Sequence, residues 1–415
     1  MNLEAYRMKI HLYKKLPIKW LLIVALILTV LSNWSYGNSY PIYVMITLLL
    51  AVLVYGEAFV HVTKKINLGE VLALMTVLVS LCAVFLGGLT VNAVKSCIMI
   101  NISVLLPLAI SSMEIDFEAG EKQICRAEWV GAAVVLLLPY MPGRWNSNSL
   151  GILIFQCATI GFLGFYLSTQ KKYKLLALVY LAFCYAEVLS TGSRNSAMIM
   201  LLCLCLLLLP KKLLEVGWFY RLIYISAMLA TVFAPNIMEF VFSNPQLMEK
   251  IEQFTSSFSD KAWGMDSHLN IILYVKNIFE DQDLLTRLLG QGVKSYHTHN
   301  LFYQSMFPYG IVGTACLYLF YAWIFELAYK LYKRNHDRLA LACSVILVGH
   351  FLLQCAEVYM FGIESPFVLA FVPAGLILIR WNKWKHKNKT LPACQQLSEN
   401  QYQAEKTMFE SRPVR

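Results

Sequence analysis

Residues 71–94 read VLALMTVLVSLCAVFLGGLTVNAV, a run that contains no charged side chain. A run of roughly 20 mostly apolar residues can cross the hydrocarbon core of a bilayer as an α-helix. The rest of the chain has the same character, because 58% of its 415 residues are apolar and only 14% are charged. Soluble domains carry about a quarter charged residues. The composition therefore excludes a soluble enzyme, a nucleic-acid-binding domain and a secreted disulfide-rich fold.

Similar apolar runs recur along the chain and predict an all-α polytopic membrane protein with about twelve transmembrane helices. We expect these helices near residues 17–35, 41–63, 69–91, 96–112, 127–141, 149–167, 174–190, 195–210, 217–236, 301–328, 339–358 and 364–380. The long hydrophilic interruption at 237–300 predicts a large, partly helical periplasmic loop between helices 9 and 10. The chain is thus divided into helices 1–9 (1–236), this loop, helices 10–12 (301–380) and a polar cytoplasmic tail (381–415).

The distribution of basic residues predicts the orientation of the spans, because cytoplasmic segments carry an excess of Lys and Arg. If both termini are cytoplasmic, most of the 35 Lys and Arg residues lie on the inner side. They come from segments near residues 7–19, 64–65, 122–126, 171–174, 211–221, 330–338 and 380–415. The net charge of +10 is therefore interpreted as a topology signal and not as a sign of a nucleic-acid partner.

The turn Ser190-Thr191-Gly192-Ser193-Arg194-Asn195-Ser196, between spans seven and eight, contains the first candidate site residues. An arginine at membrane depth is costly unless it pairs or faces a polar cavity. The planar guanidinium of Arg194 suits bidentate binding of a phosphate, to which the neighbouring hydroxyls and the following helix N-terminus would add donors. The alternative is an interfacial arginine whose charged head extends to the membrane surface.

A second candidate region ends the large loop and contains Gly290-Gln291-Gly292 followed by His297-Thr298-His299-Asn300. Thr298 or Asn300 is expected to cap the tenth span, which would place His299 beside the positive end of that helix. The alternative interpretation is an interfacial helix cap with two incidental histidines. The His-x-His spacing is only weak evidence for a metal site, because no further ligands occur at the usual spacing.

Together these motifs resemble the O-antigen polymerase and O-antigen ligase superfamily of bacterial integral membrane proteins, which includes the Wzy-type polysaccharide polymerases. Members have a Ser-x-x-Arg-like turn and a late periplasmic loop that ends in Gly-x-Gly and His-Asn before a span opening with Gly-x-x-Gly. The matching residues here are Ser190 and Ser193-Arg194, Gly290-Gln291-Gly292, His299-Asn300 and Gly310-Ile311-Val312-Gly313. The resemblance is specific over about residues 185–325 and only topological elsewhere.

The resemblance implies a glycosyltransferase-type polymerase at the outer face of the bacterial inner membrane. Such an enzyme joins undecaprenyl-pyrophosphate-linked repeat units into O-antigen or a related surface polysaccharide. It implies no cofactor and no metal, because the donor is already activated. The implied partners are lipid-linked glycans, membrane lipids, a chain-length regulator and a flippase, and no nucleic acid.

The expected site combines the motifs with the chemistry of this reaction. Arg194 would neutralise the leaving pyrophosphate, His299 would act as general base, and His268 would orient substrate or transfer a proton. The expected substrate-binding residues are Ser193, Asn300, His297, Arg287 and Lys276. The family often has an arginine where His268 stands, so Lys276 or Arg287 would have to supply the missing charge.

The sequence is also compatible with two other functions. The first is an O-antigen ligase of the same superfamily, which transfers finished glycan to lipid A core. The second is a secondary transporter with twelve spans, although the two halves of the chain show no evident repeat.

The predicted orientation can be tested with reporter fusions. A phosphatase inserted at Asp260 should be active, because residues 237–300 are expected outside, and a fluorescent protein at the C-terminus should fold in the cytoplasm. An inactive phosphatase together with a dark C-terminal reporter would show that the orientation is wrong.

Overall fold

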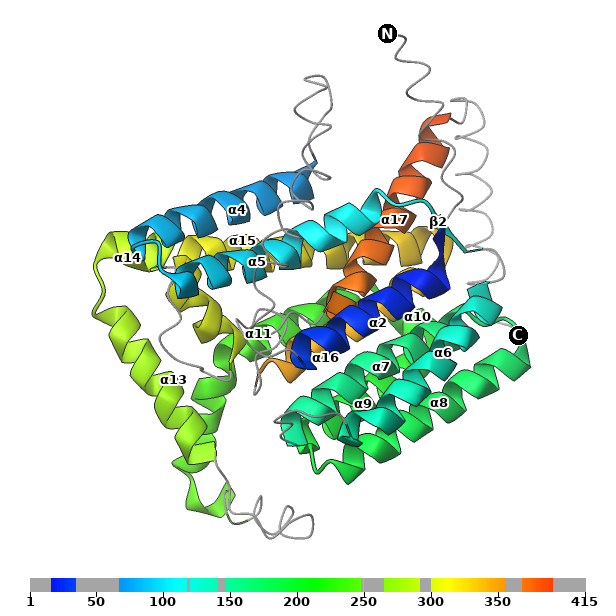
Figure 1. Ribbon diagram of the computed structural model, residues 1–415, viewed down its shortest axis with the longest axis horizontal. Coiled ribbons are helices and arrows are strands. Elements are labelled where there is room, and N and C mark those ends of the chain that lie inside the picture. Colours follow the sequence, from blue (N-terminus) through cyan, green and yellow to red (C-terminus); the bar gives the residue numbers. More distant parts are fainter. Residues whose placement is uncertain are drawn as a thin grey trace, which may run out of the picture.

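The computed structural model describes residues 16–34, 67–117, 120–140, 147–247, 249, 265–291, 300–355 and 368–390. These residues are mainly helical (Figure 1). The helices are α2 (Ile18–Trp34), α4 (Leu68–Leu86), α5 (Val91–Ser111), α6 (Gly120–Leu137), α7 (Ser147–Leu167), α8 (Lys171–Ser190), α9 (Arg194–Leu208), α10 (Lys211–Glu215), α11 (Gly217–Phe242), α13 (Met265–Glu280), α14 (Leu284–Leu289), α15 (Leu301–Asn335), α16 (Arg338–Leu353) and α17 (Val368–Thr390). A 3₁₀ turn (Leu138–Tyr140) follows α6, and two short parallel strands, β1 (Leu16–Pro17) and β2 (Ile115–Asp116), pair with each other.

Within these described residues, five helices are long and apolar enough to cross a membrane: α4, α7, α8, α11 and α15. Their outward faces carry large exposed apolar side chains such as Phe85, Leu175 and Leu229. Soluble monomers rarely expose such surfaces, whereas lipid covers them at no cost. The chain is an all-α membrane protein, as its composition predicts.

Eleven of the twelve expected spans overlap a helix in the described part of the chain. The remaining one, the second span at 41–63, lies outside the described residues. The number of spans that cross the membrane stays a prediction. The helices α13 and α14 lie in the segment 237–300, which was expected to be partly helical. Helix α13 includes the largely apolar stretch at 269–275.

Three helices extend beyond their expected ends. Helix α11 continues through Pro235 to Phe242, α15 continues past residue 328 to Asn335, and α17 continues past residue 380 to Thr390. The extension of α17 is held by contacts to other elements, because Lys383 Nζ donates to Ile115 O at 3.1 Å and the Arg334 guanidinium lies 5.1 Å from the centre of the Trp384 ring. Sequence hydropathy does not predict such contacts.

Helix α16 lies at the centre of the bundle, where it packs against α7, α9, α11, α15 and α17. Its residues from Leu339 to Phe351 are all buried. Near its start, Asp337 caps the helix and pairs with Arg380 at 2.6 Å. At the same end of the bundle Arg221 forms a two-pronged contact with Glu326, with Nε–Oε1 at 2.7 Å and Nη2–Oε2 at 3.1 Å. Figure 1 shows β2, α10 and the end of α17 on this side and α13 and α14 on the opposite side.

Helix α15 is broken at Gly310, which has φ +64° and ψ −175°. The break divides it into a first segment (301–309) and a second segment (311–335). A Cβ on Gly310 would lie 2.6 Å from Gly290 N, and a Cβ on Gly290 would lie 2.5 Å from Tyr309 N. Gln291 N donates to Phe307 O at 3.2 Å. The end of the loop and the break in α15 are thus in direct backbone contact, and we call this contact the glycine junction.

The glycine junction predicts a large effect of a single methyl group. Gly310→Ala should destabilise the protein by about 2–4 kcal/mol, because it adds a backbone clash to the strain of a positive φ. Gly88→Ala is the matched control, since Gly88 has φ +77° with nothing within 4 Å of its added Cβ. It should cost about 1–2 kcal/mol from strain alone. Thermal unfolding of the purified proteins in detergent measures both, and equal losses would show that the junction contributes nothing.

Candidate functional site

The candidate site is a polar cluster at the C-terminal end of α16. The last carbonyls of a helix have no partner within that helix. Here Asn195 Nδ2 donates to Leu353 O at 3.2 Å, Leu301 N donates to Gln354 O at 3.0 Å, and Asn300 Nδ2 lies 3.4 Å from Cys355 O. The start of α9 and the start of α15 therefore meet at one point. We call Ser193, Arg194, Asn195, Asn300 and Gln354 the α16-terminus cluster.

Asn300 is fully buried and connects three helices. Its Oδ1 accepts from Tyr303 N at 3.3 Å, which confirms the expectation that Thr298 or Asn300 caps this helix. Its Nδ2 donates to Thr231 O at 2.8 Å. The Thr231 carbonyl would normally bond to the amide four residues later, but that residue is Pro235, which has no N–H. Asn300 therefore fills a gap in α11 while it caps α15, and it is the described residue next in sequence to His299.

The predicted arginine turn lies at the start of α9. Gly192 turns the chain with φ +73°, and Thr191 Oγ1 accepts from Ser193 N at 3.2 Å. Arg194 is the first residue of α9 and is partly buried. Its position at the positive end of a helix makes a second donor group available to any anion that the guanidinium binds.

Ser193 faces the interior of the bundle. It is 2% exposed, its Oγ donates to Ser196 Oγ at 3.0 Å, and it packs against Gly151 of α7. A Cβ on Gly151 would collide with Ser193 and come within 2.9 Å of Ser196 Oγ. The contacts of Ser193 are therefore to the protein, and Ser193 has a packing role at the start of α9.

A second group of predicted residues lies on α13 and α14. Lys276 and Arg287 are both partly buried. The buried Nε of Arg287 has no hydrogen-bond partner in the described part of the chain, nor do the side-chain amide atoms of Gln282. Unpaired guanidinium and amide donors are suited to an oxyanion. Asp283 caps α14 by accepting from Thr286, and these hydrogen bonds lower the pKa of Asp283.

The structure separates the two groups. The α16-terminus cluster lies at the start of the first segment of α15, and the glycine junction, which holds the end of α14, lies at its other end. That segment is nine residues long, or about 14 Å at 1.5 Å per residue. Ser193, Arg194 and Asn300 are brought together, whereas Arg287 lies on α14, towards the glycine junction, and Lys276 lies on α13. His297, His299 and the side chain of His268 lie outside the described residues.

Buried amides below the cluster were not indicated by the sequence motifs. Gln354 Nε2 donates to His350 O at 3.2 Å, and Gln156 Nε2 lies 3.3 Å from His350 Nδ1. The Gln156 Oε1 atom has no hydrogen-bond partner among the described residues. In the sequence each of these glutamines stands inside an apolar run, and no motif marks it. His350 packs edge-on against Phe155 with ring centroids 5.2 Å apart, as expected for a structural histidine.

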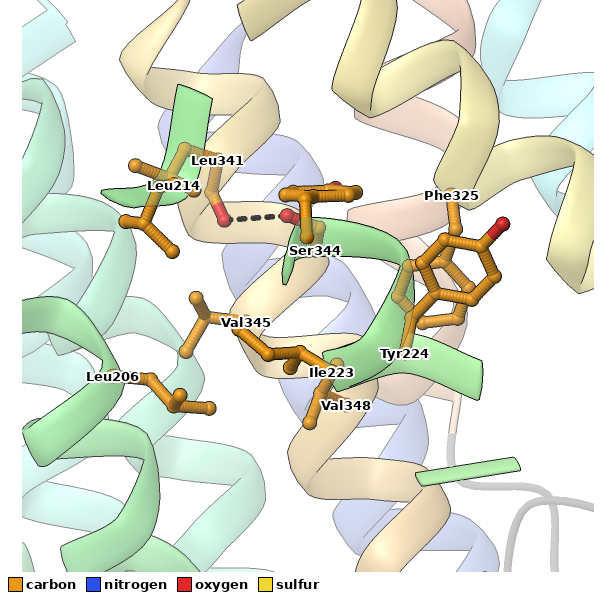
Figure 2. A pocket seen from close by; sticks show the side chains of 10 residues that line it. Leu206, Leu214, Ile223, Tyr224, Phe325, Leu341, Ser344, Val345 and Val348 are labelled. Carbon is orange, nitrogen blue, oxygen red and sulfur yellow. Dashed lines mark hydrogen bonds between the residues drawn. The ribbon is translucent and has the colours of Figure 1, made fainter. Parts of the chain in front are cut away.

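A hollow between α9, α10, α11, α15 and α16 is too small and too apolar to bind a substrate. Figure 2 shows its lining, in which Leu206, Val345 and Val348 face Tyr224 and Phe325. Its volume is about 20 Å³, room for about one water molecule. The hydroxyl of Ser344 donates to Leu341 O at 2.8 Å and is thus already paired. This hollow is a packing feature and not a site.

No protein-family model matches this chain, and no curated protein matches it. Among the described residues no group of three or more His, Cys, Asp or Glu side chains is arranged to hold a metal.

Proposed function

We propose that this protein polymerises undecaprenyl-pyrophosphate-linked oligosaccharide repeat units at the outer face of the bacterial cytoplasmic membrane. The observation that supports it is the meeting of the Arg194 turn with the Asn300 cap at the end of α16. These segments are far apart in sequence, and they are the two motifs on which the resemblance to O-antigen polymerases depends. A catalytic site requires such a meeting, whereas two incidental interfacial motifs do not.

In the cluster the positive ends of α9 and α15 and the Arg194 guanidinium outnumber the negative C-terminal end of α16, a balance that suits a leaving pyrophosphate. Both α9 and α15 begin there, so two helix N-termini with partial positive charge lie beside Arg194. Fixed donors that are already oriented stabilise developing negative charge without reorganisation. The guanidinium fork can bind two phosphate oxygens at once.

The reaction then needs one base. In this proposal His299 removes the proton of an acceptor sugar hydroxyl, whose oxygen forms a bond to the anomeric carbon of the donor. The bond from that carbon to the pyrophosphate oxygen breaks, and its electron pair leaves with the undecaprenyl pyrophosphate beside Arg194. In this proposal His299 must be a neutral imidazole, the form that a base requires, and a position beside the positive end of α15 would favour that form.

The second group of residues suits the second substrate. Polymerisation joins two lipid-linked molecules, each with a pyrophosphate, and so requires two cationic positions at the membrane surface. In this proposal Arg287, Lys276 and the Gln282 amide supply the second position, on α13 and α14 and the turn between them. His268, in the first turn of α13, would orient the acceptor there.

Two alternatives have specific support. A ligase would use the same cluster, and deletion of the gene separates it from a polymerase. Retention of one repeat with loss of the long polysaccharide ladder indicates the polymerase, whereas accumulation of lipid-linked polymer indicates the ligase. The broken helix α15 is typical of transporters. Here the break at Gly310 is packed against the backbone of Gly290, which leaves no room for a substrate at the break itself.

Arg194 should be essential in its exact chemical form. In a deletion strain, Arg194→Ala should support no polymer although the protein reaches the membrane. Arg194→Lys should be nearly as defective, because a point charge cannot form two parallel hydrogen bonds. Gel analysis of surface polysaccharide and immunoblotting of membranes provide the measurement. A normal ladder from Arg194→Lys would show that Arg194 only anchors the helix at the membrane surface.

His299 should be more important than His297. A general base contributes about 10²–10⁴-fold to a rate, so His299→Ala should leave at most a trace of polymer and His299→Gln should not restore it. His297→Ala is the matched control on the same loop and should have a milder effect. The rate of polymer formation from a lipid-linked donor by purified protein measures both. Equal losses together with inhibition by a chelator would replace the base with a metal site.

A further inference from the structure

A buried acid in α6 takes no part in the proposed reaction. Glu128 is 5% exposed, and its buried Oε1 atom has no hydrogen-bond partner in the described part of the chain. The carboxyl packs on α7 at Gly164, where an added Cβ would lie 3.2 Å from Glu128 Cδ. An ionisable residue inside a membrane helix is costly and usually functional. The sequence signal was weak, because Glu128 lies at the edge of the expected span at 127–141.

Glu128 lines a groove between α6 and α8 with a volume of about 270 Å³. The other lining residues that matter here are Trp129, Leu176, Val179, Tyr180 and Phe183. The Tyr180 hydroxyl is already occupied, because it donates to Cys157 O at 3.0 Å. Trp129 and Val179 are 67% and 59% exposed, so the groove opens towards the lipid-facing side of the bundle. It is an apolar, partly aromatic recess with one carboxyl in its lining, and the unpartnered Oε1 of that carboxyl lies against Gly164 of α7.

The groove is remote from the α16-terminus cluster. Both are in contact with α7, the cluster through Ser193 at Gly151 and the acid at Gly164. These glycines are thirteen positions apart in the sequence, which corresponds to about 20 Å of helix. The acid is therefore not part of the proposed catalytic site.

The dimensions favour a small molecule over a partner helix. The lining residues extend from Cys125 to Ala132 on α6 and from Leu176 to Phe183 on α8. Each stretch is about two turns, or roughly 11 Å, compared with about 30 Å for a transmembrane helix. The volume is close to the lower end for small-molecule sites, which are about 300–1,000 Å³, mostly apolar, and contain few polar groups.

We propose that the α6–α8 groove binds a small apolar amine, with Glu128 as its counter-group. An isolated carboxylate is too costly in lipid, so Glu128 is a neutral acid when the groove is empty. A neutral amine entering from the lipid accepts the acid proton: the O–H bond breaks, an N–H bond forms, and the resulting carboxylate–ammonium pair has no net charge. The rings of Trp129, Tyr180 and Phe183 add favourable cation–π contacts.

The test uses 1-adamantylamine as the probe and 1-adamantanol, its neutral isostere, as the ligand control. Equilibrium dialysis against the purified full-length protein in detergent should show the amine binding at least tenfold more tightly than the alcohol. Glu128→Gln should weaken amine binding at least tenfold and leave alcohol binding unchanged. Glu121→Gln is the matched variant, because Glu121 lies on the same helix but is bonded to Thr169 and Gln170 at its end. It should bind the amine normally.

A second measurement needs no variant and holds even if Glu128→Gln fails to fold. Dicyclohexylcarbodiimide is an apolar reagent that adds a protonated carboxyl across its C=N bond and leaves a stable acylurea. Peptide mass spectrometry of the wild-type protein should find this adduct at Glu128, and 1-adamantylamine should slow its formation at least tenfold. Equal binding of amine and alcohol, unchanged binding by Glu128→Gln, or labelling that the amine does not slow would each overturn the proposal.

Discussion

The arrangement of this protein depends on the need to pair backbone carbonyls where no water can reach them. Inside a bilayer each unpaired backbone group costs several kcal/mol. The end of α16 leaves carbonyls unpaired, and Pro235 and Pro107 each remove a donor within a helix. Side chains of α15 fill both proline gaps: Asn300 donates to Thr231 O and Tyr321 donates to Ser103 O at 2.9 Å. Because the carbonyl four residues before a proline is the one left without its amide, these are the positions where the donors are needed.

This requirement also places the candidate site. Asn300 can reach Thr231 and the end of α16 only if α15 begins there, and Asn195 reaches the same helix end from α9. The N-termini of two helices are thereby fixed beside Arg194. The same hydrogen bonds that pair the last carbonyls of α16 also bring the positive ends of α9 and α15 together at the end of α16. Stability and the proposed chemistry therefore share the same residues.

The contrast between Asn300 and Glu128 shows what an unpaired group indicates. Both are buried in the bundle, but the side chain of Asn300 is bonded to three backbone groups. The carboxyl of Glu128 has an oxygen without a partner and lies against an apolar groove. A buried group that lowers stability and forms no hydrogen bond is better explained by a ligand that binds to it.

The sequence by itself determined the class of the protein, because hydropathy over about 20 residues reflects the thickness of the bilayer and not the packing of any neighbour. It also predicted local features that depend on nearby residues, such as the cap at Asn300 and the helical content of the segment 237–300. The tertiary structure alone decided that α15 breaks at Gly310, because that break exists where the backbone of Gly290 approaches. It likewise decided that Asn195 and Asn300 meet at α16, that Ser193 faces the protein, and that Arg287 lies apart from Arg194. Each of these depends on contacts between residues far apart in sequence, and local composition carries no record of such contacts.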